Sequence, residues 1–221
     1  MPKIIVFNAP PRAGKDECAK YLTNLVNESQ NGKKATHMEF KAQLFEITAA
    51  FFGISVEEYK KGYDLSTEEV MGPPFGKTHD PEWFKDYPRF WVTDSVYPDP
   101  KKSWYSERTG LIHVSENVIK PFFGEKAFGI MLANSIPEEI DYVFVSDSGF
   151  PQELQGVVDK FGHDVITVIR LYREDCSFDN DSRDYLQPEM FDYRIKFIDI
   201  ENNYDTLEDL HEVLDEVMLY E

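Results

Sequence analysis

Short apolar runs alternate with segments of helical periodicity along most of the chain. Unbroken apolar runs are typical of strands in a buried parallel sheet, and apolar residues at three- and four-residue steps indicate helices with one buried face. The pattern predicts strands at residues 3–7, 36–40, 142–145, 164–171 and 194–200. It predicts helices directly after Asp16 and over residues 44–52, 111–132, 151–161 and 207–218, with breaks at Pro121 and Gly124. This order predicts an α/β fold, a five-stranded parallel sheet with helices on both faces.

The segment of about residues 62–110 departs from this pattern. Its prolines break regular structure, and it contains all three tryptophans of the chain, Trp83, Trp91 and Trp104. We predict a single domain over residues 1–221 with an aromatic, proline-rich insertion at this place. Because long loops in compact domains are usually functional, we expect a lid over the acceptor, with aromatic faces that stack on a base. A satellite hydrophobic cluster is the alternative for each of these aromatic residues.

Composition excludes some classes of protein. The 221 residues include 23 Lys and Arg against 41 Asp and Glu, a formal net charge of -18 at pH 7. This charge argues against binding nucleic acid through a broad basic surface. The two cysteines, Cys18 and Cys176, are far apart in sequence, which fits a reducing compartment and offers no metal cluster. We expect no signal peptide, no membrane partner and a cytoplasmic location, the host cytoplasm if a phage encodes the chain; a homodimer stays open.

The segment from Ala9 to Asp16, between the first strand and the first helix, has the chemistry of a phosphate-binding loop. A loop at this place presents unpaired backbone N–H groups to an anion. Gly14 allows a close approach of the backbone, and Lys15 supplies a positive charge for the β- and γ-phosphates. Ala9 replaces the usual first glycine, and Asp16 replaces the usual hydroxyl residue and is predicted to hold Mg²⁺ directly or through water. An ordinary strand-to-helix turn is the alternative.

Further polar residues follow the later strands. Asp147 comes after the strand at 142–145, where open α/β sheets bind ligands, and could contact Mg²⁺ or accept a proton from an attacking hydroxyl. Its alternative role is to cap the helix that begins near Pro151. Arg170 and Arg173 introduce a polar loop and could clamp a transferring phosphoryl group or pair with neighbouring acids at the surface. We expect the phosphate-binding loop and Asp147 to meet at one edge of the sheet.

Together these residues resemble the phage-type deoxynucleoside monophosphate kinases, a family of the P-loop kinase superfamily. The resemblance covers most of the chain outside the insertion, and the Lys15-Asp16 pair is its most characteristic element. In chain order, its motifs are Arg12 to Asp16, residues 40–53, Ser106-Glu107-Arg108, Ser146-Asp147 with Glu153, Arg170, Arg173, Asp181-Ser182-Arg183 and Asn203.

The resemblance implies an ATP- and Mg²⁺-dependent kinase with an ATP lid at about residues 173–190. The residues implied to bind ATP are Arg12, Ala13, Gly14, Lys15, Asp16, Arg170 and Arg183. The residues implied to lie on the acceptor side are Lys41, Phe45, Arg108 and Ser146. The implied catalytic residues are Lys15, Asp147 and Arg173, and the implied metal ligands are Asp16 and Asp147.

Two positions depart from the family and bear on the acceptor. The family carries Asp-x-Arg where this chain has Asp147-Ser148-Gly149, and Leu-Lys where it has Leu44-Phe45. We expect phosphoryl transfer to a deoxynucleotide-type acceptor, with a deoxynucleoside monophosphate favoured. This chain thus lacks two cations that the family carries near the acceptor, which weakens the case for an acceptor with a free phosphate. The main alternative is phosphorylation of 5-hydroxymethyluracil in DNA, a step of base hypermodification. A nucleotide-binding module without catalysis and a dephospho-coenzyme A kinase-like activity also stay open.

Overall fold

The chain divides into two compact units. The computed structural model describes residues 1–70, 107–179, 181, 183–204 and 206–219. The larger unit comprises residues 1–43 and 123–221, and the smaller unit comprises residues 44–122. The predicted insertion falls within the smaller unit, and the part of it that carries the three tryptophans lies outside the described residues.

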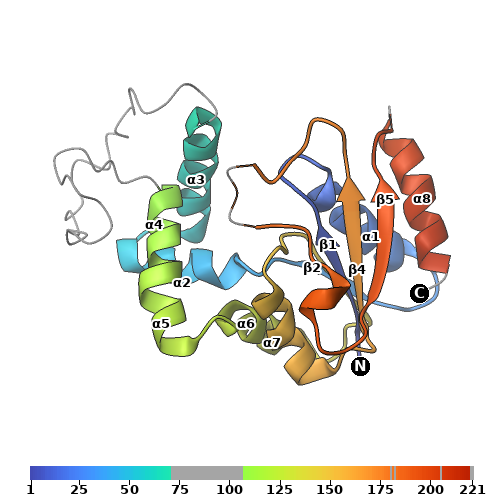
Figure 1. Cartoon of the computed structure of the whole chain (residues 1–221), viewed down its shortest axis with the longest axis horizontal. Helices are drawn as coiled ribbons and strands as arrows, with labels where there is room; N and C mark the ends of the chain where they lie inside the picture. The colour runs from blue at the N-terminus through green and yellow to red at the C-terminus, as the bar shows by residue number, and fades with distance from the viewer. Residues whose placement is uncertain (71–106, 180, 182, 205, 220–221) are drawn as a thin grey trace. The chain divides into compact units, whose positions relative to one another are not determined.

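A five-stranded parallel sheet forms the centre of the larger unit (Figure 1). Its strands are β1 (Lys3–Asn8), β2 (Ala35–Met38), β3 (Tyr142–Val145), β4 (Ile166–Tyr172) and β5 (Lys196–Glu201). They lie in the order β2-β3-β1-β4-β5, so β1 is central and pairs with β3 and β4. The predicted α/β class with five parallel strands is confirmed. The carboxyl ends of all these strands meet at one edge of the sheet.

Helices cover this sheet. Those of the larger unit are α1 (Lys15–Glu28), α6 (Ala127–Ser135), α7 (Pro151–Phe161) and α8 (Leu207–Leu219), with a 3-10 turn at Pro188–Met190. Phe7 of β1 shares a buried cluster with Leu22 of α1 and Leu214 of α8. Val6, which points to the opposite face, is equally buried. In Figure 1, α6 and α7 lie on the other side of the strands from α8. Thr206 caps α8 by accepting a hydrogen bond from the backbone N–H of Asp209 (3.2 Å).

Helices α6 and α7 pack backbone to backbone at two glycines. A Cβ at residue 129 would overlap the backbone carbonyl of Glu153 in α7. A Cβ at Gly156 would lie 2.7 Å from the backbone nitrogen of Ile130 in α6. Both contacts are with backbone, which cannot rotate away, so the two helices approach as closely as they do only because neither position carries a side chain.

Replacing Gly129 with alanine is therefore expected to lower the free energy of unfolding by about 3 kcal/mol, because the added methyl forces α6 and α7 apart. Urea unfolding measures the change. The neighbouring Ile130 has 43% of its surface exposed, and its replacement by alanine should cost less than about 1 kcal/mol. A Gly129→Ala protein as stable as the unmodified chain would contradict the close packing.

The smaller unit is helical where the structure describes it. It contains most of α2 (Ala42–Phe52), α3 (Val56–Val70), α4 (Glu107–His113), a π-helical turn (Val114–Ile119) and α5 (Lys120–Phe123). The hydroxyl of Tyr59 in α3 donates to the backbone carbonyl of Glu107 in α4. Among the helices of both units that the structure describes, none is long and apolar enough to cross a membrane.

Two boundaries in this unit differ from the prediction. Irregular structure was expected from Gly62, but α3 continues to Val70. Gly62 lies against the side chain of Glu107, where a Cβ would overlap the carboxyl group, so this glycine serves close packing inside a helix. A break was expected at Pro121, but the chain stays helical through it. The preceding π turn, in which the N–H of Lys120 bonds to the carbonyl of Ser115, changes the hydrogen-bond register just before the proline.

Candidate functional site

The loop between β1 and α1 leads into a helix N-terminus without a side-chain cap. Gly14 is the N-cap residue of α1, and no side chain accepts a hydrogen bond from the first turn. Arg12 and Gly14 have φ angles of 66° and 91°, in the left-handed region that is unusual for arginine. The first N–H groups of a helix have no partner within the helix. This arrangement is the backbone chemistry that binds phosphate groups.

Lys15 folds back over this loop. Its Nζ donates a hydrogen bond to the backbone carbonyl of Pro10 (3.2 Å), and the residue is only 7% exposed. Burial lowers the pKa of Lys15, and the positive charge of Arg183 lowers it further, against the opposing effect of Asp16. A bound anion would offset both the burial and the repulsion between these cations.

Asn202, directly after β5, holds the loop from the other side. Its Nδ2 donates to the backbone carbonyl of Ala13 (2.8 Å), and its own backbone N–H donates to the carbonyl of Tyr172 (2.7 Å). A Cβ at residue 14 would lie 3.0 Å from this Nδ2. Gly14 is therefore required both by its left-handed backbone and by the approach of Asn202.

A cavity of about 390 Å³ opens beside the loop. Its lining includes the loop residues Arg12 and Lys15, Arg173 after β4, and Tyr204 and Leu210 from the segment after β5. A larger hollow of about 460 Å³ lies at the opposite edge of the sheet, where Lys3 and Lys196 begin their strands. Because open α/β sheets bind ligands at the carboxyl ends of their strands, the cavity beside the loop is the candidate nucleotide site.

Asp147 lies buried at the same edge, two residues after the end of β3. Its Oδ1 accepts a hydrogen bond from the backbone N–H of Phe40 (2.7 Å), and its Oδ2 accepts one from Lys41 (3.0 Å). The carboxylate therefore fixes the chain where it leaves β2. The alternative role as a cap of the helix at Pro151 is wrong, because the N-cap residue of α7 is Phe150 and no side chain caps that helix.

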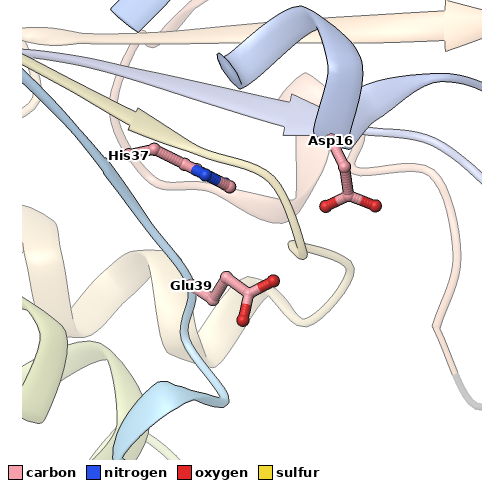
Figure 2. Close-up of side chains that lie close together, drawn as sticks. All are labelled: Asp16, His37 and Glu39. Atoms are coloured by element: carbon pink, nitrogen blue, oxygen red, sulfur yellow. The ribbon is translucent and has the colours of Figure 1, made fainter. Parts of the chain in front are cut away.

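Asp16, His37 and Glu39 form a group that could hold a metal ion. Each side chain offers a ligand atom, and these atoms lie within 4.8 Å of one another (Figure 2). Nε2 of His37 and Oγ of Ser146 are 2.8 Å apart in a hydrogen bond, and Nζ of Lys41 lies 3.8 Å from Glu39. The two carboxylates suit Mg²⁺, and the imidazole adds a nitrogen ligand more typical of Mn²⁺ or Zn²⁺. Of the two predicted metal ligands, Asp16 belongs to this group, whereas both oxygens of Asp147 accept backbone hydrogen bonds.

The arginines of the predicted ATP lid have different surroundings. Arg173 lines the cavity beside the loop. Arg170 binds Asp199 of β5 through two donors (2.6 and 2.8 Å) and also donates to the side chain of Gln187 (2.7 Å). It thus ties the end of the lid segment to the sheet, and its predicted contact with a nucleotide stays a prediction. Arg183 packs over Gly149 and forms an ion pair with Asp181.

The predicted acceptor-side residues are divided between the two units. Lys41 and Ser146 lie in the larger unit, near Asp147 and His37 as described above. Phe45 lies in the smaller unit, is 2% exposed and packs edge-on against Tyr63. This burial makes Phe45 part of that unit's core. Arg108 is half-buried on α4 of the same unit.

The larger unit thus brings together Lys15, Asp16, Asp147 and Arg173 at the carboxyl edge of one sheet. No protein-family model matches the chain, and no curated protein matches its sequence. Function therefore has to be inferred from the chemistry of the site itself.

Sequence reasoning missed several residues of this edge, namely His37, Glu39, Asn202 and Tyr204. Each lies at or shortly after the carboxyl end of β2 or β5, a position at which open α/β sheets bind ligands. The predicted strand at residues 194–200 therefore contained a usable signal for Asn202 and Tyr204, whereas the strand predicted at 36–40 placed His37 and Glu39 within it and not at its carboxyl end.

Proposed function

We propose that this chain is an ATP-dependent phosphotransferase of the P-loop kinase type that acts on a deoxynucleotide-type acceptor. The observation that carries the proposal is the buried Lys15 beside an uncapped helix N-terminus, at the mouth of a cavity of about 390 Å³. Burying an ammonium group is costly, and the charge of Arg183 adds to this cost beyond what Asp16 offsets. The position of Lys15 is accounted for if the triphosphate of a nucleotide supplies further negative charge.

The cavity supports a placement for the rest of the nucleotide donor. With the phosphates on the loop, the sugar and base would extend towards Tyr204 and Leu210, which line the same cavity. Arg173, directly after the carboxyl end of the neighbouring strand β4, would then reach the phosphates from the same edge of the sheet. The Asn202 side chain would keep the loop backbone in its binding conformation through its bond to Ala13.

The reaction forms a bond from an acceptor oxygen to the γ-phosphorus and breaks the bond from that phosphorus to the oxygen of ADP. Lys15 and the N–H groups at the start of α1 stabilise the charge that spreads over the transferred group. Asp147 holds the chain after β2 in place through Phe40 and Lys41. A divalent ion held by Asp16, with Glu39 and His37 in reach, would neutralise phosphate charge when bound.

The favoured acceptor is a deoxynucleoside monophosphate, and 5-hydroxymethyluracil in DNA is the second candidate. The second candidate is favoured because residue 45 is a phenylalanine where the family carries a lysine. The ring of Phe45 is buried among aromatic residues, with Nζ of Lys60 5.1 Å from its centroid. The first is favoured by Arg183, whose aliphatic stem fills the space beside Gly149, the position where the family carries an arginine. A monophosphate acceptor carries a phosphate group of its own, which a cation of the site has to bind. A hydroxymethyl group carries none.

A transfer assay with γ-labelled ATP tests the proposal and separates the acceptors. The four deoxynucleoside monophosphates and DNA that contains 5-hydroxymethyluracil are offered side by side, with the matched thymine DNA as control. We expect label on at least one monophosphate. Label on the hydroxymethylated DNA alone would select the second candidate, and ATP binding without any acceptor-dependent transfer would instead favour a nucleotide-binding module.

A further inference from the structure

Gly149 makes room for an arginine from elsewhere in the chain. A Cβ at residue 149 would lie 2.7 Å from Cγ of Arg183 and 3.0 Å from its Cδ. The aliphatic stem of Arg183 therefore occupies the space that a side chain at residue 149 would need. Gly149 lies two residues after Asp147, so this packing brings the arginine to the carboxyl end of β3.

The segment around Arg183 is held against the sheet by Asn8, the last residue of β1. The buried side chain of Asn8 donates to the backbone carbonyl of Asp184 (3.1 Å) and accepts from the N–H of Leu186 (2.7 Å). The next residue after Asn8 opens the phosphate-binding loop. Arg183 and that loop are thus attached to the same strand end.

The guanidinium of Arg183 is paired with a carboxylate. Its Nε and Nη2 donate to the two oxygens of Asp181, at 3.0 and 2.6 Å. The side chains are only 21% and 11% exposed, so the pair is largely shielded from water. Carboxylate and phosphate both accept two parallel hydrogen bonds from one guanidinium, so one can replace the other on the same arginine.

The family resemblance already implies that Arg183 binds ATP. We propose in addition that Gly149 is the position that admits this arginine to the site, and that the Asp181 carboxylate pairs with it until a phosphate group of the nucleotide takes its place. This inference rests on the proposed function and extends it. Gly149 and Asp181 are positioning residues that act through Arg183. The exchange of the Asp181 carboxylate for a phosphate group on Arg183 breaks no covalent bond and transfers no proton, because one anion replaces another.

Binding of inorganic tripolyphosphate and of ADP, measured by calorimetry, tests the proposal. Arg183→Gln should weaken both by about 10- to 100-fold, the effect of losing hydrogen bonds to a charged group. Asp181→Asn should tighten both by several fold, because the competing carboxylate is gone. Gly149→Ala should weaken both towards the level of Arg183→Gln. The matched control is Arg194→Gln, an exposed arginine at the opposite edge of the sheet, which should bind as the unmodified chain does.

A double-variant comparison separates this proposal from a general effect on folding. In the Arg183→Gln background, Asp181→Asn and Gly149→Ala should have no further effect on binding, because both act through the arginine. Arg183→Lys keeps the charge without the two parallel donors and should recover only part of the affinity. Thermal unfolding of each variant accompanies the titrations.

The outcomes distinguish the proposal from the function on which it rests. If the unmodified chain binds tripolyphosphate or ADP and Arg183→Gln binds equally well, the proposal is overturned while the nucleotide site stands. Asp181→Asn that binds more weakly would also overturn it, since the carboxylate would then assist and not compete. If the unmodified chain binds neither compound, both are wrong.

Discussion

Replacing Lys15 with methionine is expected to reduce phosphoryl transfer by about 10²- to 10³-fold, the cost of removing one charged group aimed at a transition state. The same change should leave the free energy of unfolding unchanged or slightly higher. Lys15 is 7% exposed and its Nζ bonds to one backbone carbonyl, so the folded chain carries the cost of burying an ammonium group. Methionine has a similar length and avoids that cost.

The two effects are measured on the same preparation, by labelled transfer from ATP and by thermal unfolding. Lys20→Met is the matched control, because Lys20 lies on the same helix with a side chain that is 58% exposed. It should transfer as the unmodified chain does. A Lys15→Met protein that retains full transfer would remove this lysine from the site, whereas one that loses transfer only because it unfolds would assign it a structural role.

Replacing Asp147 with asparagine is expected to lower stability and transfer together. The two oxygens of Asp147 accept the backbone N–H groups of Phe40 and Lys41, and an asparagine can accept only one of these bonds. Loss of a hydrogen bond to a charged group, with a buried N–H left unpaired, costs about 2 to 4 kcal/mol. Because the chain after β2 carries Glu39 and Lys41, its displacement should also reduce transfer by about 10²-fold or more.

Urea unfolding and transfer at a temperature well below the unfolding midpoint separate the two effects. Asp192→Asn, a substitution of the same kind at an exposed position, is the control and should change neither. Wild-type transfer by folded Asp147→Asn would exclude this carboxylate from the mechanism. Normal stability with lost transfer would instead point to direct contact between Asp147 and the reacting groups.

The sheet could be predicted from the sequence because each strand can be recognised from the residues of its own short segment. β1, β3 and β4 are mostly apolar, β2 and β5 mix apolar with polar residues, and each predicted strand lies within two residues of the observed bounds. The bounds predicted for α7 are those observed, since Pro151 starts it and Gly162 follows its last residue. Prolines and glycines in the smaller unit were less informative. Pro121 sits in a helix because a π turn precedes it, and Gly62 sits in one because Glu107 packs against it.

The candidate site could be predicted only in part, because its chemistry depends on contacts between distant segments. The loop proposed to bind phosphate was visible as Gly14-Lys15 between a strand and a helix. The packing of Arg183 over Gly149 was not, since the two residues are far apart in sequence and no periodicity links them. Phe45 was expected beside the acceptor from its position in the motif, but its ring is buried in the smaller unit.

The decisive measurement is a crystal structure of the chain with a non-hydrolysable ATP analogue and Mg²⁺. We predict that the β- and γ-phosphates contact the N–H groups at the start of α1 and Nζ of Lys15, which then leaves the carbonyl of Pro10. The base should lie in the cavity lined by Arg173 and Tyr204. An analogue bound instead in the hollow beside Lys3 and Arg194, at the amino ends of the strands, would contradict the proposed site.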